Sequence, residues 1–228
     1  MKGLSESLFN QKLRFKNENG EYFPDWRLGK LGQVFTFKVT NSYSRDKLNY
    51  HEGYVKNIHY GDIHTKYGTL LNLQNESTPY INSDVNISKI EEENYCKIGD
   101  LIVADASEDL KDVGKSIEVV NLNGQKVLAG LHTILARPLH NIFSIGFCGY
   151  LFKSEKIRQQ IQKEAQGSKV LSISTTRLSN VLLEIPALEE QTKIALSLSV
   201  LSDKIDTEKN ILKKYKRQRV YLLKKLFI

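Results

Sequence analysis

The sequence predicts an α+β fold in which a compact mixed domain is followed by a long C-terminal coiled-coil helix. Short apolar segments alternate with turns marked by glycine through much of the chain, as strands do in a small mixed domain. The last forty or so residues instead carry apolar side chains spaced three and four residues apart. With 40% hydrophobic residues and only four prolines, the composition is that of a globular protein.

Residues 1–25 are expected to form a short helical segment and a connector. Leu4, Leu8 and Phe9 have helical spacing, and the stretch from Asn17 to Pro24 is rich in turn formers. The domain is expected to span residues 26–185. It begins after Trp26 with apolar residues at 28, 31, 34 and 35, a spacing that suits a short helix.

Five short strands and one longer strand are expected next, because apolar runs are separated by turn formers. They are residues 35–40, 54–58, 69–73, 98–104, 117–120 and 126–136. A buried apolar run follows at 142–152. Ser154 is then placed to cap a helix with Ile157, Ile161 and Ala165 on one face, and Gly167 to end it. A loop rich in Ser and Thr leads to an apolar segment at 178–185.

Residues 186–228 are expected to form one helix that pairs with another long helix. Pro186 suits the start of a helix, and Glu189 and Glu190 lie in the first turn, where the helix dipole favours anions. At about 1.5 Å per residue the helix is roughly 60 Å long, more than a domain of ordinary size covers. The alternative is a surface helix that covers its own domain. The expected interface is Ile194, Leu198, Leu201, Ile205, Leu212, Tyr215, Leu222 and Leu226, interrupted by Glu208 and Arg219.

The net charge of +7 comes from the end of this helix. Eight of the 33 Lys and Arg residues lie in residues 209–228, which contain no Asp or Glu, so the rest of the chain has 25 basic and 26 acidic residues. A basic block of this kind neutralises phosphates or an acidic protein surface, although a solvated helix face is the commoner explanation. Charge alone therefore does not establish DNA binding.

Neither a membrane span nor a signal peptide is recognisable, so we expect a cytoplasmic protein without a membrane partner. Cys96 and Cys148 lie outside any Cys-x-x-Cys pair and are interpreted as ordinary reduced side chains.

Three segments together carry a family resemblance. Residues 55–63 and 98–104 each place Gly-Asp beside an apolar strand, as Gly61-Asp62 and Gly99-Asp100. Residues 167–178 then lead to Ile185-Pro186-x-x-Glu189-Glu190-Gln191-x-x-Ile194. In this order, over essentially the whole chain, they resemble the DNA specificity subunit of type I restriction-modification systems. The resemblance assigns residues 26–185 as a target recognition domain and residues 186–228 as the family's coiled-coil spacer helix.

The resemblance implies a non-catalytic subunit that selects a sequence in double-stranded DNA and docks methyltransferase (modification) subunits. Those partners would bind S-adenosylmethionine, and a restriction and translocase subunit would add ATP and magnesium; this chain would hold no cofactor and no metal. Family members usually carry two recognition domains and two helices. This sequence has one of each, preceded by residues 3–9, which resemble residues 221–227 at the end of the helix. It is thus expected to act as a half-size form that pairs through the helix with an identical or a different half.

Residues in the predicted loops are the candidates for contact with DNA, because side-chain donors and acceptors recognise base edges. For each of them a solvated loop residue is the alternative. They are Tyr43, Ser44, Arg45, Lys47, His59, His64, Lys66, Tyr67, Lys111, Lys115, Ser168, Lys169, Ser174, Thr175, Thr176 and Arg177.

Enzyme functions find little support in the sequence. Adenine methylation needs an Asn/Asp-Pro-Pro-aromatic motif, and the four prolines are never adjacent. A magnesium-dependent nuclease is disfavoured because Asp25 and the later Asp109-Leu110-Lys111 are far apart and no Glu-x-Lys occurs. The histidines at 51, 59, 64, 132 and 140 lack metal-ligand clustering. Two other hypotheses stay open: a coiled-coil scaffold that does not recognise DNA, and a silent or truncated specificity cassette.

Overall fold

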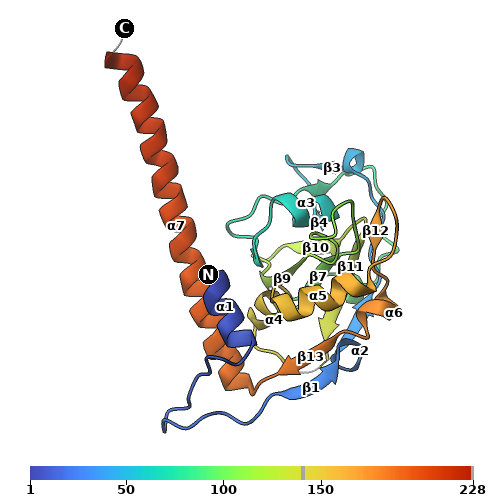
Figure 1. Ribbon diagram of the computed structural model, residues 1–228. Coiled ribbons are helices and arrows are strands. Elements are labelled where there is room, and N and C mark those ends of the chain that lie inside the picture. Colours follow the sequence, from blue (N-terminus) through green and yellow to red (C-terminus); the bar gives the residue numbers. More distant parts are fainter. Residues whose placement is uncertain (140–141, 227–228) are drawn as a thin grey trace.

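A computed structural model describes residues 1–139 and 142–226 of the chain. His140 and the last two residues of the expected spacer helix, Phe227 and Ile228, lie outside the described residues. The structure has the predicted α+β architecture, with a mixed domain and a long C-terminal helix (Figure 1).

A five-stranded sheet forms the centre of the domain, in the order β2-β11-β7-β9-β5. The two faces of this sheet are buried against different layers. Successive side chains of β7 therefore point alternately to one layer and to the other. Leu101 and Val103 point into one hydrophobic core, and Ile102 and Ala104 point into another. The strands are β2 (Phe35–Lys38), β5 (Leu70–Asn72), β7 (Leu101–Ala104), β9 (Ser116–Asn121) and β11 (Thr133–Pro138).

The second layer is a four-stranded sheet in the order β10-β4-β6-β3, accompanied by helix α3. Its bounds are β3 (Leu48–Asn49), β4 (Val55–Ile58), α3 (Tyr60–Thr65), β6 (Tyr80–Ile81) and β10 (Lys126–Ala129). The prediction of one strand over 126–136 was wrong. The chain turns at Gly130 to His132, where His132 has a φ of 54°, so β10 and β11 belong to different sheets.

Helices cover the opposite face of the central sheet. They are α1 (Lys2–Phe9), α2 (Leu31–Val34), α4 (Phe147–Leu151), α5 (Glu155–Glu164), α6 (Thr175–Leu178) and the start of α7 (Leu188–Leu226). The expected short helix over 28–35 is only partly correct. Its first residues form β1 (Arg27–Lys30), which pairs antiparallel with β13 (Leu182–Ile185) and joins the two ends of the domain.

Helix α7 has two parts with different surroundings. Ile194 and Leu198 are buried in the domain core against α4. These two residues were predicted to contact a second helix, and that prediction was wrong because their own domain already covers them. Farther along, Leu212 is 53% exposed and Leu226 is 75% exposed. Figure 1 shows this part of α7 extending away from the domain. In the described part of the chain, no helix is long and apolar enough to cross a membrane.

A buried polar junction attaches α7 to the domain and to the N-terminal segment. The carboxylate of Glu190 accepts hydrogen bonds from Arg14 Nε (3.1 Å), Arg14 Nη2 (2.9 Å) and Trp26 Nε1 (3.0 Å). Gln191 accepts a bond from Ser144 N (2.9 Å) and donates to the carbonyl oxygen of Pro186 (2.9 Å). The Pro-x-x-Glu-Glu-Gln segment thus fixes the direction in which α7 leaves the domain.

Candidate nucleic-acid interface

The loops predicted to contact DNA meet around one short strand, β8 (Ala106–Ser107). On one side, His64 of α3 contacts the carbonyl oxygen of Ala106 through Nε2 (3.0 Å). On the other side, β12 (Leu171–Ser172) pairs antiparallel with β8. We call the surface formed by α3, the 3-10 turn η1 (Arg45–Lys47), residues 105–115 and residues 166–177 the β8 surface.

The first predicted group, at η1, is held in place by carboxylates. Arg45 donates two hydrogen bonds to Asp62, from Nη1 and Nη2, each 2.9 Å long. Lys47 Nζ lies 3.2 Å from Asp84, and the hydroxyl of Ser44 donates to Asp46. Tyr43, just before this turn, is partly buried against a cluster on the four-stranded sheet formed by Val55, Ile81 and Leu128.

His59 and Tyr67 were predicted to contact DNA, and the structure contradicts both predictions. His59 is buried and caps α3, because its Nδ1 accepts a hydrogen bond from Gly61 N (3.2 Å). Burial and the nearby Arg45 charge lower its pKa. Tyr67 is buried beneath α3, where its hydroxyl donates to Thr78 Oγ1 (3.0 Å), and burial raises its pKa. Neither side chain is available to a duplex.

The second predicted group connects α3 to the loop that follows β8. Lys115 donates from Nζ to the carbonyl oxygen of His64 (2.8 Å) and lies 3.3 Å from Asp112. Lys66 lies over the ring of Tyr50, 4.6 Å from its centroid, and donates to the carbonyl oxygen of Ser77. Lys111 is exposed, with its side chain at the surface of the loop.

The third predicted group lies at β12 and α6, next to β8. Ser174 caps α6 by accepting a hydrogen bond from Arg177 N (3.3 Å), and Arg177 Nη1 pairs with Glu164 at 3.2 Å. The remaining members of this group are exposed: Ser168, Lys169, Thr175 and Thr176. Hydroxyls and a lysine of this kind are suited to contact phosphates or base edges.

Residues that the sequence did not single out complete the β8 surface. The ring of Tyr60 packs against His132 at 5.2 Å and His64 at 5.8 Å between ring centroids. His132 Nδ1 lies 3.3 Å from the carboxylate of Asp105. Burial raises the pKa of Asp105, and the nearby His132 only partly opposes this rise. Tyr60, His132 and Asp105 come from separate parts of the chain, and no local motif indicates that they meet. Their aromatic faces and ring nitrogens lie beside the predicted hydroxyl and lysine groups.

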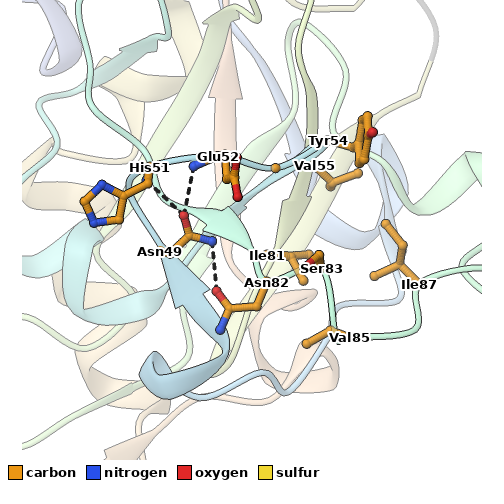
Figure 2. A pocket seen from close by; sticks show the side chains of 11 residues that line it. Asn49, His51, Glu52, Tyr54, Val55, Ile81, Asn82, Ser83, Val85 and Ile87 are labelled. Carbon is orange, nitrogen blue, oxygen red and sulfur yellow. Dashed lines mark hydrogen bonds between the residues drawn. The ribbon is translucent and has the colours of Figure 1, made fainter.

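A cavity of about 760 Å³ opens beside β3 and β6 at the edge of the second sheet (Figure 2). Asn49 Nδ2 donates to Asn82 Oδ1 (2.9 Å) in its wall, and Tyr54, at its rim, is 93% exposed. An exposed aromatic ring of this kind is a platform for stacking, and side-chain amides are suited to hydrogen bonding with bases. None of these three residues could be identified from the sequence, since a lone tyrosine or asparagine in a loop carries no signal.

The β8 surface presents hydrogen-bonding groups more than unpaired charges. Most of its cations are already matched by carboxylates, as Arg45, Lys47, Lys115 and Arg177 show. Over residues 1–139 and 142–226, no group of three or more His, Cys, Asp or Glu side chains is placed to hold a metal ion.

The chain is similar in sequence to known proteins. The family model described as type I restriction modification DNA specificity domain matches residues 24–217. A protein of Methanocaldococcus jannaschii, provisionally named type I restriction enzyme MjaX specificity subunit, is 26% identical over 219 residues. The match covers 93% of this chain and 48% of that protein.

Two solved structures are similar in fold. The HsdS subunit from Thermoanaerobacter tengcongensis superposes with a TM-score of 0.56 at 15% identity, over 91% of this chain and 44% of that one. A chain from a structure of the type I R-M system, on its complex assembly and conformational transition, gives 0.57 at 16% identity, over 92% and 47%. This chain therefore spans about half the length of the relatives that it matches. With the family model matching most of its length, the chain belongs to the specificity subunit family of type I restriction-modification systems.

Proposed function

We propose that this chain is a non-catalytic specificity subunit that recognises one half of a bipartite DNA target. The β8 surface contacts the half-site, and α7 holds the domain at a fixed distance from a second recognition domain. That second domain belongs to an identical or a different half. Methyltransferase subunits dock against the domain and α7, and the catalytic centres lie on those other chains.

The observation that carries this proposal is the uncovered apolar side of α7. Beyond Leu198, the helix keeps apolar residues at the spacing of a coiled-coil seam; Leu201 and Ile205 are half-buried, and the later ones are left in solvent. Leu212, Tyr215 and Leu222 are all exposed. Burying one such leucine contributes about 1.5–3 kcal/mol, so pairing with a second helix is strongly favoured.

Division of labour among the subunits follows from the same proposal. S-adenosylmethionine belongs to the methyltransferase subunits, and ATP and magnesium belong to a restriction and translocase subunit where one joins the complex. The near-neutral domain recognises base edges, while contacts to phosphates position it on the duplex. The basic end of α7, with eight Lys and Arg and no acid after residue 208, is suited to phosphates or to an acidic partner surface.

The test is selection of bound duplexes from a randomised pool, with and without the modification subunits. We expect the complete assembly to recover a split target in which one half depends on this chain. Exchange of the exposed Thr175 and Thr176 for alanine should weaken the preference at individual base pairs of that half. An assembly that recovers no sequence preference would rule the proposal out.

A scaffold that does not recognise DNA is the competing function, and the matched cations of the β8 surface favour it. Salt dependence separates the two, because contacts with phosphates make log K fall linearly with log salt. Binding to a partner protein without any affinity for duplex at any salt concentration would identify a scaffold. A silent cassette would show neither activity.

A further inference from the structure

A second cavity, of about 560 Å³, lies between α1, α5 and the loop that follows β8. It is lined by charged and polar side chains from all three elements. Lys2 and Ser5 come from α1, Lys111 from the loop, Lys153 from the turn before α5, and Arg158 and Gln162 from α5. Four cations line it against two acids, Glu6 and Glu155, so its wall is net positive.

The two acids lie together where α5 begins. Glu6 Oε1 accepts a hydrogen bond from the backbone N–H of Glu155 (3.1 Å), and the Glu155 carboxylate lies 3.8 Å from Lys2. Gln159 also donates to Glu155 (3.2 Å). These contacts engage both carboxylates, and neither lies within 4.0 Å of the charged nitrogens of Lys111, Lys153 or Arg158.

Arg158 contributes a charge without a carboxylate partner to the wall of the cavity. Its Nη2 donates to the carbonyl oxygens of Lys111 (3.0 Å) and Val113 (2.6 Å). Within the described residues, its Nη1 is enclosed and has no hydrogen-bond partner. Burial lowers its pKa, and the acid that opposes this effect, Asp112, is already paired with Lys115 at 3.3 Å.

Lys153 adds a second cation to the wall of the cavity. The residue is exposed as a whole, but its Nζ donates to the hydroxyl of Thr69 (2.8 Å) and has no carboxylate within 4.0 Å among the residues described. Loss of water around this ammonium group, and then the charge of Lys115, lower its pKa to about 8. Lys111 is exposed at the rim. Lys111, Lys153 and Arg158 thus line the cavity, and within the described residues none of their charged nitrogens has a carboxylate within 4.0 Å.

We propose that this cavity binds a phosphate group, held by Lys111 and Lys153 over the charge of Arg158, with Ser5 and Gln162 as neutral donors. Ammonium groups and hydroxyls donate hydrogen bonds to phosphate oxygens, and a bound anion would reduce the repulsion between the neighbouring cations. The cavity adjoins the β8 surface, because Lys115 bonds to α3 and Arg158 bonds to the same loop. The inference rests on the proposed function in one respect: the phosphate is that of the DNA backbone.

The first arm of the test uses inorganic phosphate and the full chain at constant ionic strength. Isothermal titration calorimetry should detect binding of inorganic phosphate to the wild type. Lys111→Gln and Lys153→Gln should each weaken it about tenfold, the loss of one charge-assisted hydrogen bond. Lys111→Gln keeps the backbone carbonyl oxygen that accepts a hydrogen bond from Arg158. This variant therefore tests the site even if Lys153→Gln folds poorly. Lys89→Gln, an equal change of charge on an exposed loop residue elsewhere, is the matched control and should bind as the wild type does.

The second arm measures duplex binding by the chain assembled with its modification subunits, over a range of salt concentrations. Loss of one phosphate contact should reduce the slope of log K against log salt by about 0.9 in Lys111→Gln, with the sequence preference unchanged. An unchanged slope together with weakened binding of inorganic phosphate would make the source a free phosphate compound rather than DNA. No duplex binding by the wild type would refute the proposed function and leave the phosphate site standing. No phosphate binding by the wild type, or equal binding by all variants, would overturn the site itself.

Discussion

Asp62 and Asp100, which each follow a glycine, have the same task in two different places. Asp62 receives two hydrogen bonds from Arg45, and Asp100 receives two from Arg137, at 2.8 and 2.7 Å. Each pair links a loop to a layer of the domain, η1 to α3 in the first case and β11 to the start of β7 in the second. The Gly-Asp segments that carried the family resemblance are thus explained by stability of the domain rather than by contact with DNA.

Glu190 should be the most sensitive carboxylate at the junction between the domain and α7. Glu190→Ala would leave Arg14 Nε and Trp26 Nε1 without an acceptor and the Arg14 charge without its buried partner, and breaking a buried pair on one side costs about 3–5 kcal/mol. Urea unfolding followed by the fluorescence of Trp26, the one tryptophan of the chain, measures the change directly. The adjacent Glu189 is exposed, and Glu189→Ala should change the unfolding free energy by less than about 0.5 kcal/mol. Equal costs at both positions would contradict this role.

Glu118 should make the stability of the domain depend on pH. Its buried carboxyl group accepts hydrogen bonds from Gly146 N (2.6 Å) and Gly149 N (2.7 Å) at the start of α4. Burial raises its pKa from 4.5 to about 7, although those hydrogen bonds lower it. Between these two values the folded protein holds a proton that the unfolded chain has lost. The free energy of unfolding should therefore fall as pH rises from 4.5 to 7, by up to about 3 kcal/mol at about 1.4 kcal/mol per pKa unit.

Glu118→Gln provides the check on that pH dependence. Chemical denaturation at a series of pH values should give a flatter profile for this variant, whatever its stability at any single pH. Glu18→Gln, at an exposed position in the N-terminal connector, should keep the slope of the wild type. A wild-type profile that rises over the same pH range would show that the carboxyl group is ionised in the folded protein.

At the scale of the elements, α7 is one helix with two roles. Its first turns are part of the domain core, and its later turns carry the same periodicity without a neighbour. Leu198→Ala should lower the unfolding free energy of the domain by about 2–5 kcal/mol, as is typical of a buried leucine. Leu212→Ala should leave that quantity within about 0.5 kcal/mol of the wild type, because the side chain is exposed in the single chain.

Leu212→Ala, which should leave the domain stable, should instead weaken assembly with the second half. Sedimentation velocity of the chain with its second half should show weaker association for Leu212→Ala, because that leucine belongs to the uncovered seam. A loss of domain stability in both variants would mean that α7 folds onto its own domain along its full length. Unchanged association of Leu212→Ala would place the contact with the second helix elsewhere.

The sequence predicted the elements better than it predicted their surroundings. The seam of α7 is a true helical periodicity, but a stripe of this kind looks the same whether it is buried by its own domain or by another chain. That is why Ile194 and Leu198 were assigned to the interface. The break between β10 and β11 was missed for a related reason. Residues 126–136 read as one apolar run, and only the backbone at His132 directs them to two sheets.

For the candidate site, too, the sequence predicted where the loops are but not what surrounds their residues. The loops around β8 could be predicted because they are polar and rich in turn formers. Their roles could not, because His59 and Tyr67 lose their solvent contact only when α3 packs onto the sheet. Tyr60, His132 and Asp105 meet through long-range packing, and their spacing along the chain does not predict these contacts.

At the scale of the whole molecule, the domain is fixed to one end of a rod. The junction at Glu190 and Gln191 sets the direction of α7, and residues 188–226 span about 58 Å at about 1.5 Å per residue. In the proposed function the length of this rod determines how far apart the two half-sites lie. Recognition of bases and measurement of distance are thereby assigned to separate parts of the chain, and each can be altered without the other.

Insertion of four helix-forming residues after Asp203 tests this separation, because the site lies beyond the last buried residue of α7, Leu198. Four residues lengthen the helix by about 6 Å and turn it by about 40°, so the seam stays nearly in phase. The gap in the recognised target should change by about two base pairs at about 3.4 Å each, while both half-site sequences stay the same. Mapping of methylated adenines measures the gap, and Lys204→Ala, which alters the same turn without changing its length, should leave it as it is. An insertion variant that methylates targets with the original gap would show that something other than α7 sets the distance.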